Sequence, residues 1–132
     1  CIQSPWVRYN VISNYKNRIE SALKRGVNVC IKYSSPQDGF KAKNRFERVE
    51  KFDIDKDSEN YFDSLKSKFP QNFKVIATKE FDHSKILICD EEFMIMGSFN
   101  WLSFGGEQEK REETSNIIDN KDSIVKEINK FL

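Results

Sequence analysis

The chain has 132 residues, enough for one domain with a real core and too few for two. Hydrophobic residues make up 38% of the chain and aromatic residues 13%, which excludes a disordered polypeptide. The formal net charge of +1 excludes a generally basic nucleic-acid-binding protein, so any grip on a polyanion must be local.

Cellular context is indicated by what the sequence lacks. It has no apolar run of about 18 residues and no signal-peptide pattern, so we expect no membrane association. Cys1, Cys30 and Cys89 form no C-x-x-C pair, and with a single histidine they argue against a zinc site. This cysteine usage suits the reducing cytoplasm, where we expect the protein. The chain begins with Cys instead of Met, so we interpret residues 1–132 as one domain excised from a longer protein.

The N-terminal part predicts a strand–helix–strand unit. Residues 1–3 have the pattern of a strand end, and helical spacing of apolar side chains predicts a helix over residues 9–24, with Gly26 as its C-terminal cap. Alternating apolar side chains predict a strand over residues 27–33. This order of elements favours a parallel pair of strands within an α/β layer.

Residues 34–57 form a long polar segment in which basic side chains alternate with phenylalanines. We predict that this segment binds substrate, because cations can contact phosphates while aromatic rings stack on bases. The alternative is that the phenylalanines belong to the core and the charges form a solvated face. The predicted substrate-binding cations are Lys41, Lys43, Arg45 and Arg48.

The rest of the chain predicts further strands between two helices. A helix over about residues 58–69 is ended by Pro70, and alternation then predicts a strand through residues 73–77. Strands near residues 83–89 and 93–97 follow, joined by a tight turn, and a glycine-containing loop over 101–111 leads to a last strand at 115–118. An amphipathic helix over 121–132 closes the domain. We therefore expect an α/β fold with a mixed, largely parallel β-sheet flanked by helices.

Polar side chains that could take part in a chemical reaction cluster between residues 83 and 100. His83, the only histidine, precedes Lys85 by two residues in an apolar run that predicts a strand, where residues i and i+2 share a face. Ser98 and Asn100 repeat this spacing after a second apolar stretch. An imidazole, an ammonium, a hydroxyl and an amide that converge on one point suit phosphoryl transfer, because they supply a nucleophile or acid, a fixed positive charge and hydrogen-bond donors.

This segment resembles the signature of the phospholipase D superfamily, H-x-K-x-x-x-x-D-x-x-x-x-x-x-G-S-x-N. The similarity extends over nearly the whole chain, as one half of the two-motif unit that is usual in the superfamily. It implies one phospholipase D-like half-unit, and so a phosphodiesterase domain over residues 1–132. The matching residues, with every spacing kept, are His83, Lys85, Asp90, Gly97, Ser98 and Asn100.

The resemblance also implies catalytic roles. His83 is expected to be the nucleophile that forms a phosphohistidine, or the acid that protonates the leaving oxygen. Lys85 neutralises phosphate oxygens, and Ser98 and Asn100 donate hydrogen bonds to them. Glu113 resembles the downstream acid that orients the histidine ring, with Glu112 as an alternative because the register is open.

Three other positions lie within or beside the signature. The superfamily has an acid at the position of Asp90, but alternation places it on the face opposite His83, so we interpret it as mainly structural. Gly97 permits a close approach of the backbone. Trp101 either stacks on a base or walls the site. No metal or other cofactor is implied, because Lys85 takes the place of the ion that most nucleases need.

Three functions fit this sequence, and we favour a metal-independent nuclease that cleaves DNA or RNA. The first alternative is a phospholipid phosphodiesterase or phosphatidyltransferase, which would need an exposed amphipathic surface. The second is a non-catalytic phosphate-binding or dimerisation module of a larger nucleic-acid machine, although the intact signature argues against it. The superfamily's mechanism uses two histidines across one phosphate. We therefore expect a homodimer, or pairing with a second motif-bearing half of the parent protein.

Overall fold

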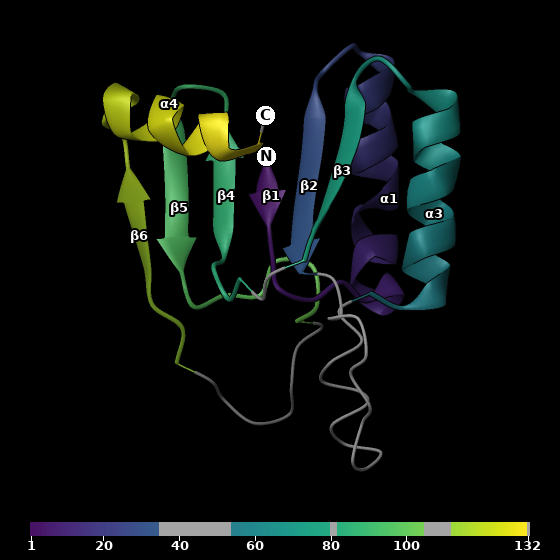
Figure 1. Cartoon of the computed structure of the whole chain (residues 1–132), viewed down its shortest axis with the longest axis horizontal. Helices are drawn as coiled ribbons and strands as arrows, with labels where there is room; N and C mark the ends of the chain where they lie inside the picture. The colour runs from purple at the N-terminus through teal and green to yellow at the C-terminus, as the bar shows by residue number, and fades with distance from the viewer. Residues whose placement is uncertain (35–53, 80–81, 105–111, 132) are drawn as a thin grey trace.

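The fold is built on one mixed sheet, seen in a computed structural model that describes residues 1–34, 54–79, 82–104 and 112–131 (Figure 1). In these ranges the sheet has six strands in the order β3-β2-β1-β4-β5-β6. The strands are β1 (Ile2–Gln3), β2 (Val29–Ser34), β3 (Phe73–Thr78), β4 (Ile86–Cys89), β5 (Phe93–Gly97) and β6 (Ser115–Ile118). The helices are α1 (Tyr9–Lys24), α3 (Lys56–Lys68) and α4 (Lys121–Ile128), and a 3-10 turn, η1 (Asn129–Phe131), follows α4.

The strand directions confirm a mixed α/β sheet but correct its expected parallel share. β1 pairs with β2, and β2 with β3, in parallel. The other three pairings in the described ranges, β1 with β4, β4 with β5 and β5 with β6, are antiparallel. For β4 and β5 the cause is local, because the turn at residues 90–92 is too short for the crossover that a parallel pair needs.

Two hydrophobic clusters cover opposite faces of the sheet. Successive strand residues point to opposite faces, and in β2 Ile31 belongs to the first cluster while Cys30 packs against the second. The first cluster joins the sheet to α1 and α3 through residues such as Ile12 and Phe62. The second joins it to α4 and η1 through residues such as Ile124. The helices therefore cover both faces of the sheet but not the ends of its strands.

One carboxylate organises the starts of two helices. Asp55 is the N-cap of α3, where Oδ1 accepts a hydrogen bond from the Ser58 N–H at 3.0 Å. Oδ2 accepts a second bond at 2.8 Å from the N–H of Tyr9, the first residue of α1. The N-cap residue of α1, Arg8, has no capping side-chain bond of its own. α3 begins two residues before the expected position because the cap is Asp55.

Several element boundaries confirm the sequence-based predictions and others move. α1 spans the expected residues, and Gly26 follows it in the left-handed conformation, with φ 83°. β6 also has the expected limits. β4 is shorter than expected and omits residues 83–85, and the C-terminal helix ends in the tighter turn η1. The greater part of the basic segment, residues 35–53, lies outside the described residues.

Among the helices of the described ranges, none is long and apolar enough to span a lipid bilayer.

Candidate active site

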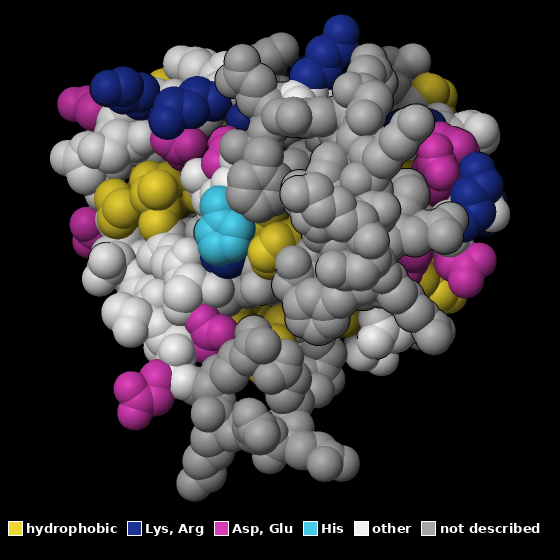
Figure 2. Space-filling view, turned by 60° about the horizontal axis from the view of Figure 1, so that its bottom comes forward, with side chains coloured by type: hydrophobic (Ala, Val, Ile, Leu, Met, Phe, Trp, Pro, Cys, Tyr) yellow, Lys and Arg dark blue, Asp and Glu magenta, His cyan; other side chains and the backbone are white. Residues whose placement is uncertain are grey.

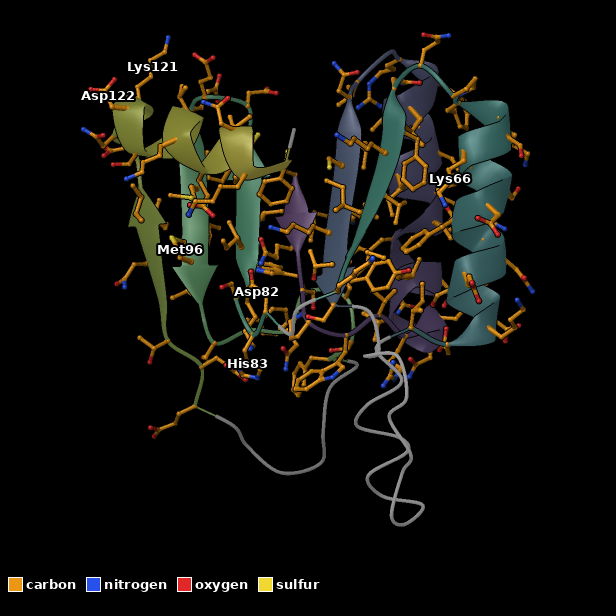
Figure 3. The ribbon with its side chains drawn as sticks, viewed as in Figure 1. Lys66, Asp82, His83, Met96, Lys121 and Asp122 are labelled. Atoms are coloured by element: carbon orange, nitrogen blue, oxygen red, sulfur yellow. The ribbon has the colours of Figure 1, made fainter. Side chains whose placement is uncertain are left out.

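His83 lies at one edge of the sheet, where several strands end. From the strand directions, β1, β2, β3 and β5 end at this edge, and β4 and β6 begin there. Figure 3 places Asp82 and His83 at this edge and Asp122 of α4 at the opposite one. The carboxyl ends of parallel strands commonly bind ligands in α/β proteins, so this edge is the natural place for a site.

The structure brings His83 and Lys85 into contact. The Lys85 Nζ atom lies 2.9 Å from His83 Nδ1 and 3.1 Å from Nε2, and it donates a 2.6 Å hydrogen bond to the His83 carbonyl. Lys85 is buried, with 5% of its surface exposed. His83 is exposed, and Figure 2 shows its ring at the surface with hydrophobic side chains near it. A hidden ammonium thus lies next to an accessible imidazole.

The backbone at His83 differs from the expected strand. Residues 82–85 lie before the first residue of β4, because the Ser84 N–H is bonded to the Asp82 side chain instead of a neighbouring strand. His83 and Lys85 still meet, because the Lys85 side chain folds back on the preceding residues. Their contact therefore depends on this turn of the chain and not on strand alternation.

The electrostatics of this pair favour a neutral imidazole. Burial and the Lys85 ammonium lower the pKa of His83, and the carboxylate of Asp82 opposes them. Burial also lowers the pKa of Lys85, while Glu113 and Asp82 raise it. A neutral imidazole has a free ring nitrogen, which is the form that can act as a nucleophile.

Trp6 is a site residue that sequence reasoning did not identify. Its ring meets the His83 ring edge-on, with centroids 5.4 Å apart. The Lys85 Nζ atom lies over the same indole, 5.9 Å from its centroid. The signal in the sequence was the Ser-Pro-Trp turn directly after β1, because the carboxyl end of a strand is where site residues gather.

Ser98 and Glu113 lie on the neighbouring strand ends. The N–H of Gly97, at the end of β5, donates to the Lys85 carbonyl at 3.3 Å. The Ser98 hydroxyl donates to the Glu113 carboxylate and accepts from the Thr114 N–H at 3.0 Å. The structure thus places the Glu113 carboxylate against Ser98, and its charge raises the pKa of Lys85. The role of Glu113 or Glu112 in orienting His83 stays a prediction.

Asn100 and Trp101 follow in the turn after β5. The carbonyl of Asn100 accepts the N–H of Phe104 at 3.0 Å, and its side-chain Oδ1 is buried without a hydrogen-bond partner among the described residues. Trp101 is half-buried, packs against the first core cluster and meets the Phe99 ring at 5.0 Å. This packing favours the wall over the stacking platform for Trp101. The Asn100 Oδ1 atom is an acceptor, so only a hydrogen-bond donor can satisfy it.

Asp90 lies away from this group. It is exposed in the turn after β4, at the other end of that strand from Lys85, with φ 50°. This position supports the structural interpretation, because Asp tolerates the left-handed conformation better than most residues. The predicted binding residues Lys41, Lys43, Arg45 and Arg48 lie outside the described residues.

Possible metal ligands are scattered over the part of the chain that the structure describes. There, no three His, Cys, Asp or Glu side chains gather closely enough to hold a metal ion.

Comparison with known proteins places this geometry in context. The family model described as "Cardiolipin synthase, PLD-like domain" matches residues 7–132. The solved structure of NucT from Helicobacter pylori is similar in fold, with a TM-score of 0.54 and 20% sequence identity over 98% of this chain and 75% of that chain. A search of curated proteins found no match to this sequence.

Proposed function

The chain belongs to the family of phospholipase D-like domains, and on that premise we propose that it is a metal-independent nuclease that cleaves DNA or RNA at His83. The observation that carries this proposal is the contact of the accessible His83 ring with the buried Lys85 ammonium. A positive charge fixed beside a nucleophile draws a phosphodiester to it and stabilises the negative charge of the transition state. Lys85 thereby does what a metal ion does in other nucleases.

The proposed reaction has two steps. In the first, a ring nitrogen of His83 attacks phosphorus, the bond from phosphorus to the leaving oxygen breaks, and a second imidazole gives that oxygen its proton. In the second, water attacks the phosphohistidine, the phosphorus–nitrogen bond breaks, and the second imidazole takes the proton from water. The Asn100 amide donates hydrogen bonds to the phosphate oxygens in both steps, and the Ser98 hydroxyl does so by turning its proton from Glu113 to the phosphate.

The second imidazole must come from outside this chain, because His83 is its only histidine. We propose that two copies meet about a two-fold axis with their strand-end edges together, so that one phosphate lies between two His83 rings. The alternative source is a second motif-bearing half of a parent protein.

The basic segment is the proposed grip on the nucleic acid, and the residues that flank it support this assignment. At one end, the Ser34 hydroxyl bonds to the backbone of Asp82, next to His83. At the other, Ile54 forms a β-bridge with Val7, next to Trp6. Both ends of the segment are thus attached beside the site. We propose that its basic side chains contact the phosphate backbone; they are Lys41, Lys43, Arg45 and Arg48.

The packing of the amphipathic helix α4 favours a nucleic acid over a phospholipid as the substrate. Ile124 of α4 and Phe131 of η1 are buried in the second core cluster. The apolar face of this helix is therefore occupied by the sheet, whereas a protein that acts at a bilayer needs such a face for the lipid.

The proposal is tested by incubating the purified chain with labelled single-stranded DNA, double-stranded DNA, RNA and phospholipid vesicles, with and without EDTA. We expect cleavage of nucleic acid that persists in EDTA. His83→Ala should abolish it, while Tyr15→Ala, which removes an exposed ring from α1, should retain it. Turnover of the phospholipid alone, or loss in EDTA that Mg²⁺ restores, would contradict the proposal.

Pairing is tested separately by light scattering and by mixing subunits. We expect the mass of a dimer, and a mixture of His83→Ala and wild-type subunits should be active in proportion to its wild-type homodimers. A strictly monomeric chain with full turnover would refute the two-histidine mechanism.

A further inference from the structure

The turn that carries His83 precedes β4 and is held by side-chain hydrogen bonds to residues of β1 and β2. At the end of β2, the Ser34 hydroxyl accepts a hydrogen bond from the Asp82 N–H at 3.0 Å and donates one to the Asp82 carbonyl at 3.1 Å. Ser34 is 1% exposed, so this pair of bonds is shielded from water. The backbone directly before His83 is therefore fixed to the central part of the sheet.

The side chain of Asp82 makes two further hydrogen bonds, one with β1 and one with the residue after His83. Its Oδ2 accepts a 2.7 Å bond from the side-chain amide of Gln3, a residue of β1 with 3% exposure. Its Oδ1 accepts a 2.9 Å bond from the Ser84 N–H. The Asp82 carboxylate thus connects β1 to Ser84, and each of its two oxygens accepts a hydrogen bond.

We propose that Asp82 is a positioning residue, which fixes the turn that carries His83 and Lys85 and balances the charge between these two side chains. Gln3 and Ser34 support it by holding its side chain and its backbone. The proposed role deepens the nuclease function, on which it rests for its effect on catalysis. Asp82 does not need to touch the phosphate for this role.

The charges around the pair agree with this assignment. Burial and Lys85 lower the pKa of His83, and Asp82 raises it. The pKa of Asp82 itself is lowered, because bonds from Ser84 and Gln3 and the charge of Lys32 outweigh the effect of burial, so the carboxylate stays ionised. Among the described residues, the other acidic group that acts on Lys85 is Glu113. Removing the Asp82 charge should therefore shift the titration of both His83 and Lys85 to lower pH.

The single histidine allows a direct test by NMR. The imidazole of His83 gives the one histidine titration curve of the chain, so its midpoint can be followed in each variant without assignment. We expect Asp82→Asn to lower this midpoint, and Asp122→Asn, which removes an exposed carboxylate at the far end of the molecule (Figure 3), to leave it unchanged. Asp82→Ser is the second neutral variant, because its hydroxyl can still accept the Ser84 N–H if the asparagine variant folds poorly.

Cleavage assays give the second readout. We expect Asp82→Asn to lower kcat by about 10–100-fold, as for other groups that orient a catalytic side chain, and to move the pH profile to lower pH. A simple loss of folded protein would reduce the rate without moving the profile.

The outcomes separate this inference from the proposed function. A lower His83 midpoint in both neutral variants supports the role of Asp82, and an unchanged midpoint in both overturns it. A wild-type chain that cleaves no substrate refutes the nuclease proposal, and the NMR midpoints then decide the charge-balancing role alone.

Discussion

At the scale of single residues, the site depends on how protons are shared. His83 lies beside a buried ammonium that disfavours a second positive charge, so its neutral form predominates at neutral pH. The proposed reaction, however, needs one neutral and one protonated imidazole at the same phosphate. The pH dependence of cleavage therefore reports directly on whether two copies of His83 cooperate.

We predict a bell-shaped pH profile with its optimum on the acid side of pH 6.5, the ordinary pKa of histidine. Above the optimum both imidazoles are neutral and the acid is missing, and below it both are protonated and the nucleophile is missing. The optimum lies below 6.5 because burial and Lys85 lower the pKa of His83. The measurement is kcat/KM from about pH 4 to pH 9 at constant ionic strength. A rate that rises to an alkaline plateau would show that one histidine acts alone.

The sequence identified the chemical groups of this site better than their supports. The sequence predicted the contact of His83 with Lys85, although the contact arises from the turn before β4 and not from the expected strand alternation. Gln3 lies in β1 and Trp6 shortly after it, and the pairing of β1 with β2 and β4 brings them to the site. The Ser-Pro-Trp turn marks the end of the strand, but a local pattern does not show which distant residues it will contact.

At the scale of elements, the backbones at the junction of β5 and β6 lie too close together for any side chain at Gly97. A Cβ atom at Gly97 would overlap the Thr114 carbonyl and lie 2.6 Å from the Ser115 Cα atom. These are backbone atoms of the strand that carries Glu113 into the site, so they cannot move without moving the Ser98–Glu113 contact. Gly26 presents the opposite case, with φ 83° and no atom within 4 Å of the position that an added Cβ would take.

We predict that Gly97→Ala lowers the free energy of unfolding by about 3 kcal/mol, because a methyl group is forced against backbone. Gly26→Ala should cost about 1 kcal/mol, since only its left-handed conformation is strained. Urea unfolding followed by circular dichroism measures both. Equal costs would mean that β5 and β6 separate easily at this point.

The shared cap at Asp55 predicts an unusually large effect for a surface carboxylate. Asp55→Ala removes the bonds to Ser58 and Tyr9 and should cost about 2–3 kcal/mol, because two helices lose a cap. Asn120→Ala is the matched control, because it removes the single cap of α4 and should cost about 1 kcal/mol. Thermal and urea unfolding compare the two variants. Equal losses would show that the bond to Tyr9 contributes nothing to stability.

Most elements were predictable because their patterns are local. The limits of α1 follow from apolar spacing and Gly26, and those of β6 from four residues between polar loops. The start of α3 depends on the Asp55 cap, a local signal that the sequence-based prediction did not use. The parallel share of the sheet was overestimated because β4, β5 and β6 each run antiparallel to the strand that precedes them in the sheet order.

At the scale of the whole molecule, a net charge of +1 gives no general attraction to nucleic acid. Binding must then depend on where the cations lie. Substitution of one group of basic residues at a constant change in charge can therefore distinguish a local grip from a general electrostatic effect.

We predict that replacing Lys41, Lys43, Arg45 and Arg48 with Gln weakens binding to all sequences and makes its salt dependence shallower. Each lost phosphate contact should remove about 0.7–0.9 from the slope of log K against log salt. The control replaces four exposed cations of α1 and α3, namely Arg18, Lys24, Lys66 and Lys68, and carries the same charge change. Fluorescence anisotropy over a salt series measures the slopes. Identical slopes in the two variants would support the alternative interpretation, in which the charges of residues 41–48 form a solvated face.

The attachment of Ser34 and Ile54 on either side of the basic segment has a consequence for how this protein can change. Ser34 is fixed to Asp82 and Ile54 to Val7, so both ends of this segment are anchored by described residues near His83. A flexible stretch inserted between these two anchors would cost about 0.6 kcal/mol for each doubling of its length. Sequences with other binding preferences could therefore be added there while the hydrogen bonds that hold the turn at His83 are kept.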